Sequence, residues 1–133
     1  MNEAIIISLV AYKDVDPALE LATKMINSVN VTCLITLCGI AEEDVSVEWE
    51  SISSDRSIMI NRTSNNVGYS AGHNRNFRFA SIEFGSQFKF VIANHDLIYN
   101  GSLFEFCRSI RPGLIVAPTI TFFESDVKRF GRV

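Results

Sequence analysis

The sequence has little excess charge, few cysteines and no long apolar run, and each of these shortages excludes a class of protein. Twelve Lys and Arg against 15 Asp and Glu give a net charge of −3, so the chain lacks the basic excess typical of nucleic-acid binders. No apolar run approaches the roughly 20 residues that span a bilayer. The N-terminus has neither the basic region nor the cleavage site of a signal peptide, so we expect a cytoplasmic protein without a membrane span.

The three cysteines are Cys33, Cys38 and Cys107. Their number is odd and their spacing is not that of a metal site, so we expect reduced thiols. The sequence also lacks internal repeats, low-complexity tracts and linkers. With 133 residues, 47% of them hydrophobic, the composition predicts one globular domain over residues 1–133.

Apolar runs along the chain predict five strands, of which the first suits burial on both faces. We place them at Ile5–Val10, Val31–Leu37, Ile58–Ile60, Phe88–Ala93 and Leu114–Ala117. Alternating apolar residues at 45–49 fit either a short half-exposed strand or a helical turn. The tail from Phe122 to Phe130 fits a hairpin or an edge strand.

Helical spacing of apolar residues predicts helices between these strands. One is expected at 17–28, one after Gly72 with Phe77, Ala80 and Phe84 on one stripe, and a short one around Leu103–Cys107. Buried strands that alternate with amphipathic helices predict an α/β fold, with a mostly parallel sheet and helices on both faces. Ligands in such folds bind beyond the carboxyl ends of the strands.

One candidate site is the run Asn94-His95-Asp96, which directly follows a predicted strand. A carboxylate at the mouth of a parallel sheet is well placed to hold Mg²⁺ or Mn²⁺, which take oxygen ligands and are completed by water and substrate phosphates. Asn94 points to the same side as Asp96. The alternative is that the two residues end the strand and start a turn.

A second candidate is the glycine-punctuated stretch from Asn65 to Asn76, which opens a helix. Gly68 and Gly72 allow positive φ or a close backbone approach. Asn74 supplies an amide, and a helix start offers unpaired N–H groups and a dipole that favours phosphate. The alternative is an ordinary glycine turn with polar capping. Because segments 65–74 and 94–96 both follow predicted strands, we expect them to line one pocket as neighbours.

Three single residues complete the candidates. Tyr12 follows the first strand, and its ring either stacks on a nucleobase or closes over the end of the sheet. His73 and His95 have no ligand spacing, so we expect them to be polar surface residues.

Together these motifs resemble a family of enzymes. Ala11-Tyr12-Lys13, then Asn66-Val67-Gly68-Tyr69-Ser70-Ala71-Gly72-His73-Asn74, then Asn94-His95-Asp96 are similar in type, order and spacing to the motifs of family 2 glycosyltransferases of the GT-A fold. The closest likeness is to the bacterial rhamnosyltransferase-like branch. The resemblance covers nearly the whole chain, and the last two motifs are fairly specific as a pair.

The resemblance implies a Rossmann-like domain that binds a nucleotide-diphospho-sugar with Mn²⁺ or Mg²⁺, for transfer of the sugar to a saccharide acceptor in polysaccharide biosynthesis. Asn94 and Asp96 fall at the family's metal and diphosphate motif, with Asp96 as the metal ligand. Tyr12 falls at the position where members of the family contact the nucleotide base. Asn66, Gly68, Gly72 and Asn74 fall along the donor-binding wall.

Two departures leave a competing interpretation open. Where the family has a base-recognising aspartate, this chain has Leu37-Cys38-Gly39, with acids at positions 42–44 as replacements. Family members also continue beyond position 133 with an acceptor region and a catalytic base. The alternatives are a non-catalytic or truncated relative acting as a nucleotide-binding or interaction module, and an unrelated α/β interaction domain. We expect a homodimer, associated through Phe122, Phe123 and Phe130, that does not transfer sugar by itself.

Overall fold

The computed structural model describes residues 3–13, 15–28, 31–39, 57–94 and 103–111. The elements in chain order are β1 (Ala4–Ala11), α1 (Asp16–Ser28), β2 (Thr32–Cys38), β3 (Ile58–Thr63), α3 (Tyr69–Phe84), β4 (Phe88–Ile92) and α4 (Leu103–Ser109). All seven of these elements were predicted from the sequence and are confirmed, with bounds that move by a few residues. The expected strand at 114–117, the segment at 45–49 and the tail lie outside the described residues.

The four described strands form one sheet in the order β3-β2-β1-β4. Every pairing is parallel, with Ile7 of β1 opposite Cys33 of β2 on one side and Val91 of β4 on the other. The predicted α/β class and parallel sheet are confirmed. The chain runs outward from β1 through β2 to β3 and then returns across the sheet to β4, so the strand order reverses between β1 and β4.

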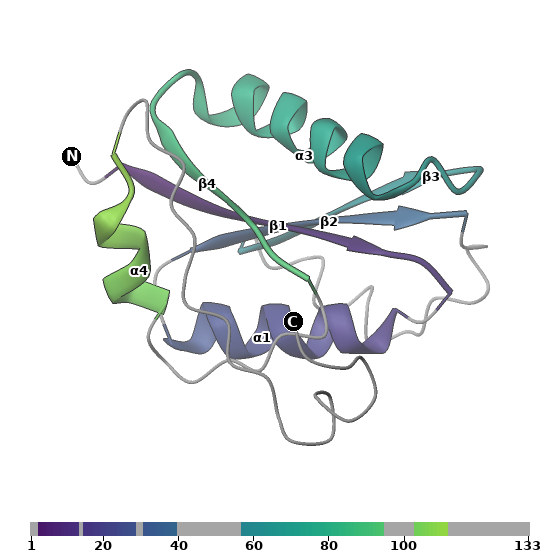
Figure 1. Ribbon diagram of the computed structural model, residues 1–133, viewed down its shortest axis with the longest axis horizontal. Coiled ribbons are helices and arrows are strands. Elements are labelled where there is room, and N and C mark those ends of the chain that lie inside the picture. The colour runs from purple at the N-terminus through teal and green to yellow at the C-terminus, as the bar shows by residue number, and fades with distance from the viewer. Residues whose placement is uncertain (1–2, 14, 29–30, 40–56, 95–102, 112–133) are drawn as a thin grey trace, which may run out of the picture.

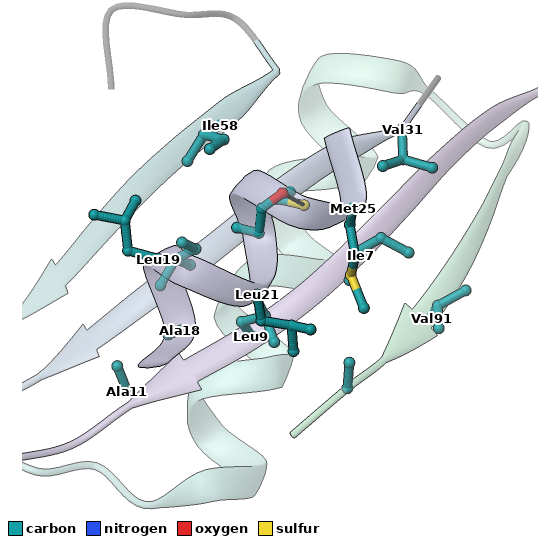
Figure 2. Close-up of a cluster of buried hydrophobic side chains, with 14 of the residues drawn as sticks. Ile7, Leu9, Ala11, Ala18, Leu19, Leu21, Met25, Val31, Ile58 and Val91 are labelled. Atoms are coloured by element: carbon teal, nitrogen blue, oxygen red, sulfur yellow. Dashed lines mark hydrogen bonds between the residues drawn. The ribbon is translucent and has the colours of Figure 1, made fainter. Parts of the chain in front are cut away.

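The helices α1 and α3 cover opposite faces of this sheet (Figure 1), which confirms that predicted feature. On the α1 face, alternate residues of the strands pack against the apolar stripe of α1 (Figure 2). Ile7, Leu9 and Leu19 in this cluster are at most 7% exposed. Fully burying side chains of this size contributes about 1.5–3 kcal/mol each, so this layer is the main apolar core of the described fold.

The α3 face is built differently. Its buried apolar cluster contains Ile6, Leu34 and Ala80, with Phe88 and Phe90 packed partly buried against it. Closer to the carboxyl end of the sheet, the residues that α3 buries are two polar ones, His73 and Asn76, and Gly72, which has no side chain. The predicted apolar stripe on this helix is therefore wrong in part, because Phe77 is 48% exposed and packs over β4 against Phe88 and Phe90.

Helix α3 also begins earlier than predicted, at Tyr69, so that Gly72 lies in its first turn instead of preceding it. Its buried residues are Gly72, His73, Asn76 and Ala80. Among the helices in the described ranges, none has both the length and the apolar character needed to cross a membrane.

Candidate functional site

The candidate site lies at the carboxyl edge of the sheet. The arrowheads of β1 and β2 point to the side of the molecule where α3 begins (Figure 1). In open parallel sheets, ligands bind outside the carboxyl ends of the strands, at the point where the strand order reverses. Here that point lies between β1 and β4, and the candidate residues can be located relative to it.

The expectation that segments 65–74 and 94–96 follow neighbouring strands is wrong. They follow β3 and β4, which are the two edges of the described sheet. Helix α3 nevertheless crosses back over the sheet, and its first turn lies against Val10 of β1. Since β1 pairs with β4, the crossing brings the glycine segment next to the point of reversal.

The start of α3 is a turn without a side-chain cap. Gly68 is the N-cap residue, with a φ of 84°, and no side chain caps the helix there. The Asn66 side chain instead accepts a hydrogen bond from Gly68 N at 3.0 Å, and Gly72 N donates to Gly68 O at 3.1 Å. A Cβ at position 68 would meet no atom within 4 Å. The positive φ, which L side chains rarely adopt, is therefore the reason that position 68 favours glycine.

Gly72 provides the close backbone approach that is one of the alternatives expected from the sequence for the two glycines. A Cβ at this position would lie 2.6 Å from Val10 Cγ2 and 2.9 Å from Cγ1. The absence of a side chain allows α3 to approach β1 closely. Gly72 is buried, and its role in donor binding stays a prediction.

The end of β2 meets the same loop. Gly39, with a φ of 63°, donates from its N–H to Thr63 O at 3.0 Å. A Cβ on Gly39 would lie 3.0 Å from Asn66 N. The Thr63 hydroxyl in turn donates to Asn65 O at 2.7 Å. The ends of β2 and β3 therefore fix the loop that leads into α3.

Tyr12 and Lys13 follow β1. The Tyr12 side chain is 46% exposed, and Lys13 Nζ lies 5.4 Å from the centroid of its ring. Lys13 has a φ of 67°, a backbone conformation that costs a non-glycine residue about 1–3 kcal/mol. An exposed aromatic ring and a nearby cation therefore lie at the end of β1, an inner strand of the described sheet.

Two further candidates are exposed. Asn74 lies on the outward side of α3, and Asn94 follows β4 two residues after Ile92, which pairs with Ser8. His95 and Asp96 lie outside the described residues. Within the described ranges, no three His, Cys, Asp or Glu side chains gather as a metal-binding group.

Sequence reasoning missed a buried polar network beneath α3, with Asn76 at its centre. Asn76 Nδ2 donates to Leu9 O at 3.0 Å and Leu34 O at 3.1 Å, carbonyl groups of β1 and β2. Its Oδ1 accepts from the Thr36 hydroxyl at 2.7 Å and from Asn61 Nδ2 at 3.3 Å. The amide is fully buried, and it joins α3 to three strands.

His73 belongs to the same network, and its predicted surface position is wrong. The residue is 4% exposed, and its Nδ1 atom lies 2.7 Å from Ser8 Oγ. Its ring packs edge-on against the Tyr69 ring, with the two ring centroids 4.3 Å apart. Burial lowers its pKa from 6.5 to about 4, because a charged imidazolium loses its hydration there. Its Nε2 atom is buried without a hydrogen-bond partner.

A signal for this network was present in the sequence. Gly72, Asn76 and Ala80 recur at a spacing of four residues, as a helix face does. The helical period is as expected, but the buried face of α3 also contains the polar residues His73 and Asn76. Buried polar side chains need hydrogen-bond partners, which here lie on the sheet.

The cysteines are free and buried, as predicted for structural thiols. Burial raises the pKa of Cys33 to about 12. Burial also raises the pKa of Cys107, against a smaller lowering effect of Lys89. A raised pKa keeps a thiol protonated and poorly nucleophilic, so neither residue contributes to a reactive site.

Neither the protein-family models nor the curated proteins that were searched give a match to this chain.

Proposed function

We propose that this chain is a nucleotide-diphospho-sugar-binding domain of the GT-A type, related to family 2 glycosyltransferases. Its ligand would lie at the carboxyl edge between β1 and β4. The base would stack near Tyr12, and the diphosphate would lie between the first turn of α3 and the residues after β4.

The observation that carries the proposal is the position of the α3 start. An uncapped helix N-terminus carries unpaired N–H groups and a partial positive charge, both of which favour phosphate. Gly72 holds this N-terminus against β1, beside the point where the strand order reverses. The motif that resembles the donor-binding wall of glycosyltransferases thus forms a helix start near that point, which supports the proposal.

The residues present fit a divalent ion only with the ligand's help. Asn94 is exposed after β4, and Asp96 follows it by two residues in the sequence. One carboxylate and one amide are too few for a tight protein site, whereas Mg²⁺ and Mn²⁺ commonly complete their shell with phosphate oxygens and water. When bound, such an ion would neutralise charge on the diphosphate leaving group.

A second candidate function is a nucleotide-binding module without transferase activity. Leu37 and Cys38, at the position of the family's base-recognising aspartate, are fully buried. Neither side chain can hydrogen-bond a base at the surface. This observation favours a relative that binds the diphosphate part of a nucleotide with little preference for the base.

Calorimetric titration of the purified chain tests the proposal. We expect UDP, GDP and dTDP to bind more tightly with Mn²⁺ or Mg²⁺ than with EDTA. Absence of binding by every nucleoside diphosphate would overturn the proposal. Turnover of a nucleotide sugar in the presence of saccharide acceptors would distinguish the transferase from the binding module.

Asp96→Ala supplies the first specific prediction. The variant should lose the metal-dependent part of nucleotide binding and retain the part that persists in EDTA, because Asp96 is the proposed protein carboxylate on the ion. Glu83→Ala is the matched control, since Glu83 is an exposed acid near the other end of α3. Nucleotide binding by Asp96→Ala that still increases with Mn²⁺ would show that the metal ligand lies elsewhere.

A further inference from the structure

The hydrogen bonds around Ser8 determine which nitrogen of His73 carries the proton. Asn76 Nδ2 lies near two backbone carbonyls, so this atom is the amide nitrogen and can only donate. It also lies 2.9 Å from Ser8 Oγ, and an amide nitrogen accepts no hydrogen bond, so the Ser8 hydroxyl cannot donate to it. The remaining partner for the Ser8 hydroxyl proton is His73 Nδ1, at 2.7 Å.

The consequence is a neutral imidazole protonated on Nε2. Nδ1 accepts from Ser8, so Nε2 carries the hydrogen. The lowered pKa of His73 agrees with a neutral ring at physiological pH. Nε2 is nevertheless buried without a partner, and leaving a buried donor unsatisfied destabilises the folded state. Such an atom in a native fold requires an explanation, and a ligand that binds there is one.

The surroundings of His73 favour a negatively charged ligand. The residue lies one turn after Tyr69, the first residue of α3, and its ring contacts the Tyr69 ring. The described strand ends and the first two turns of α3 contain Lys13, Arg62 and Arg75, and no Asp or Glu in residues 10–13, 37–39, 61–75 and 92–94. The Tyr69 side chain, which contacts the His73 ring, is 50% exposed at the start of α3.

We propose that Nε2–H of His73 donates a hydrogen bond to a phosphate oxygen of the ligand bound at the start of α3. This proposal rests on the proposed function and extends it, because it assigns a side-chain donor to the diphosphate. The network through Ser8 and Asn76 serves to hold the ring in the tautomer that can donate. Ligand binding satisfies a donor that the free protein leaves without a partner.

Two substitutions separate the two nitrogens of His73. The Gln amide nitrogen in His73→Gln falls close to the position of Nε2 and keeps the donor. The shorter amide of His73→Asn falls near Nδ1 and removes it. With inorganic pyrophosphate and with UDP, each in Mg²⁺, His73→Asn should bind at least about tenfold more weakly than wild type. His73→Gln should remain within about threefold of it.

Imidazole NMR of the wild-type protein gives a test that needs no variant. Ring ¹⁵N shifts should identify the Nε2–H tautomer in the free protein. Added pyrophosphate should shift the Nε2 and Hε2 signals, and slow the exchange of Hε2 with water. This measurement stays decisive even where a variant fails to fold.

The outcomes separate this inference from the proposed function. Binding of UDP with unchanged His73 signals and full affinity in His73→Asn would overturn the inference and leave the proposed function standing. Shifts with pyrophosphate but no binding of any nucleotide would support the inference and overturn the nucleotide assignment. A protonated Nδ1 in the free protein would also overturn the inference, since Nε2 could not donate.

Discussion

Asn76 is the side chain on which the α3 face depends most. Its amide satisfies carbonyl groups of β1 and β2 and accepts from Thr36 and Asn61. A buried network of this kind is stabilising when every member is paired, and costly when one member is removed. The residue therefore contributes to both the stability and the register of the helix on the sheet.

Substituting Asn76 tests this dependence. Asn76→Ala should lower the free energy of unfolding by about 2–4 kcal/mol, because buried hydroxyl and amide groups lose partners and a cavity is left. Urea denaturation measures the change. Asn74→Ala is the control on the same helix, where an exposed amide should change stability by less than about 0.5 kcal/mol. Equal effects of the two substitutions would contradict the network's importance.

His73 makes stability depend on pH in a defined window. Its pKa is about 4 in the folded protein and 6.5 when exposed, so between these values the unfolded chain binds more protons. Stability from this residue is therefore present above pH 6.5 and is lost as pH falls toward 4, by on the order of 3 kcal/mol.

Denaturation at pH 7.5 and pH 4.5 should show this loss in the wild type. His73→Gln, which does not titrate, should lose less stability over the same interval. Both proteins have the same carboxylates. The difference between their losses of unfolding free energy from pH 7.5 to pH 4.5 therefore gives the contribution of His73. An equal loss in both proteins would mean that the pKa of His73 in the folded state is the same as in the unfolded chain.

At the scale of elements, the contact between α3 and β1 sets the position of the helix start. The stiff, branched side chain of Val10 occupies the place where a Cβ on Gly72 would lie. Any side chain at position 72 therefore pushes the first turn of α3 away from the sheet. The proposed phosphate site would move with it.

Gly72→Ala should destabilise the protein by about 1–3 kcal/mol, the usual cost of overpacking. It should also weaken nucleotide binding, by moving the helix N-terminus. Adding Val10→Ala removes the opposing methyl groups, so the double variant should lose less stability than the sum of the single changes. Simple additivity in thermal or urea unfolding would show that the clash does not limit the approach.

At the scale of the whole molecule, apolar side chains remain exposed around β4, an edge of the described sheet. Phe77 is 48% exposed and Ile92 is 57% exposed. Exposed apolar patches favour association, and closed dimers are the commonest product. Association through residues 122, 123 and 130 stays a prediction, since these lie outside the described residues.

Sedimentation at tens of micromolar, roughly the range where association-prone proteins aggregate, tests the dimer. The wild type should sediment as a dimer. Ile92→Lys should shift the equilibrium toward monomer if the patch at β4 is buried between copies. Ile82→Lys is the control, because Ile82 is 80% exposed on α3 and lies away from its buried stripe. A monomeric wild type would contradict the association itself.

The sequence by itself determined the α/β class, because runs such as Ile5–Val10, apolar except for Ser8, are typical of strands that are covered on both faces. It also determined most element positions and the glycine turn before α3, since these follow from local periodicity and backbone conformation. The motifs that resemble those of glycosyltransferases could also be found from the sequence, because each is a contiguous stretch of chain.

Only the tertiary structure decided which residues meet. Strand order is set by long-range pairing, so the sequence wrongly placed segments 65–74 and 94–96 after neighbouring strands. The burial of His73 follows from the same cause: its partner Ser8 is 65 positions away in the chain. Asn76 likewise has its partners on three strands. Local patterns report the face of a helix, whereas the polar partners on that face exist only once helix and sheet have packed together.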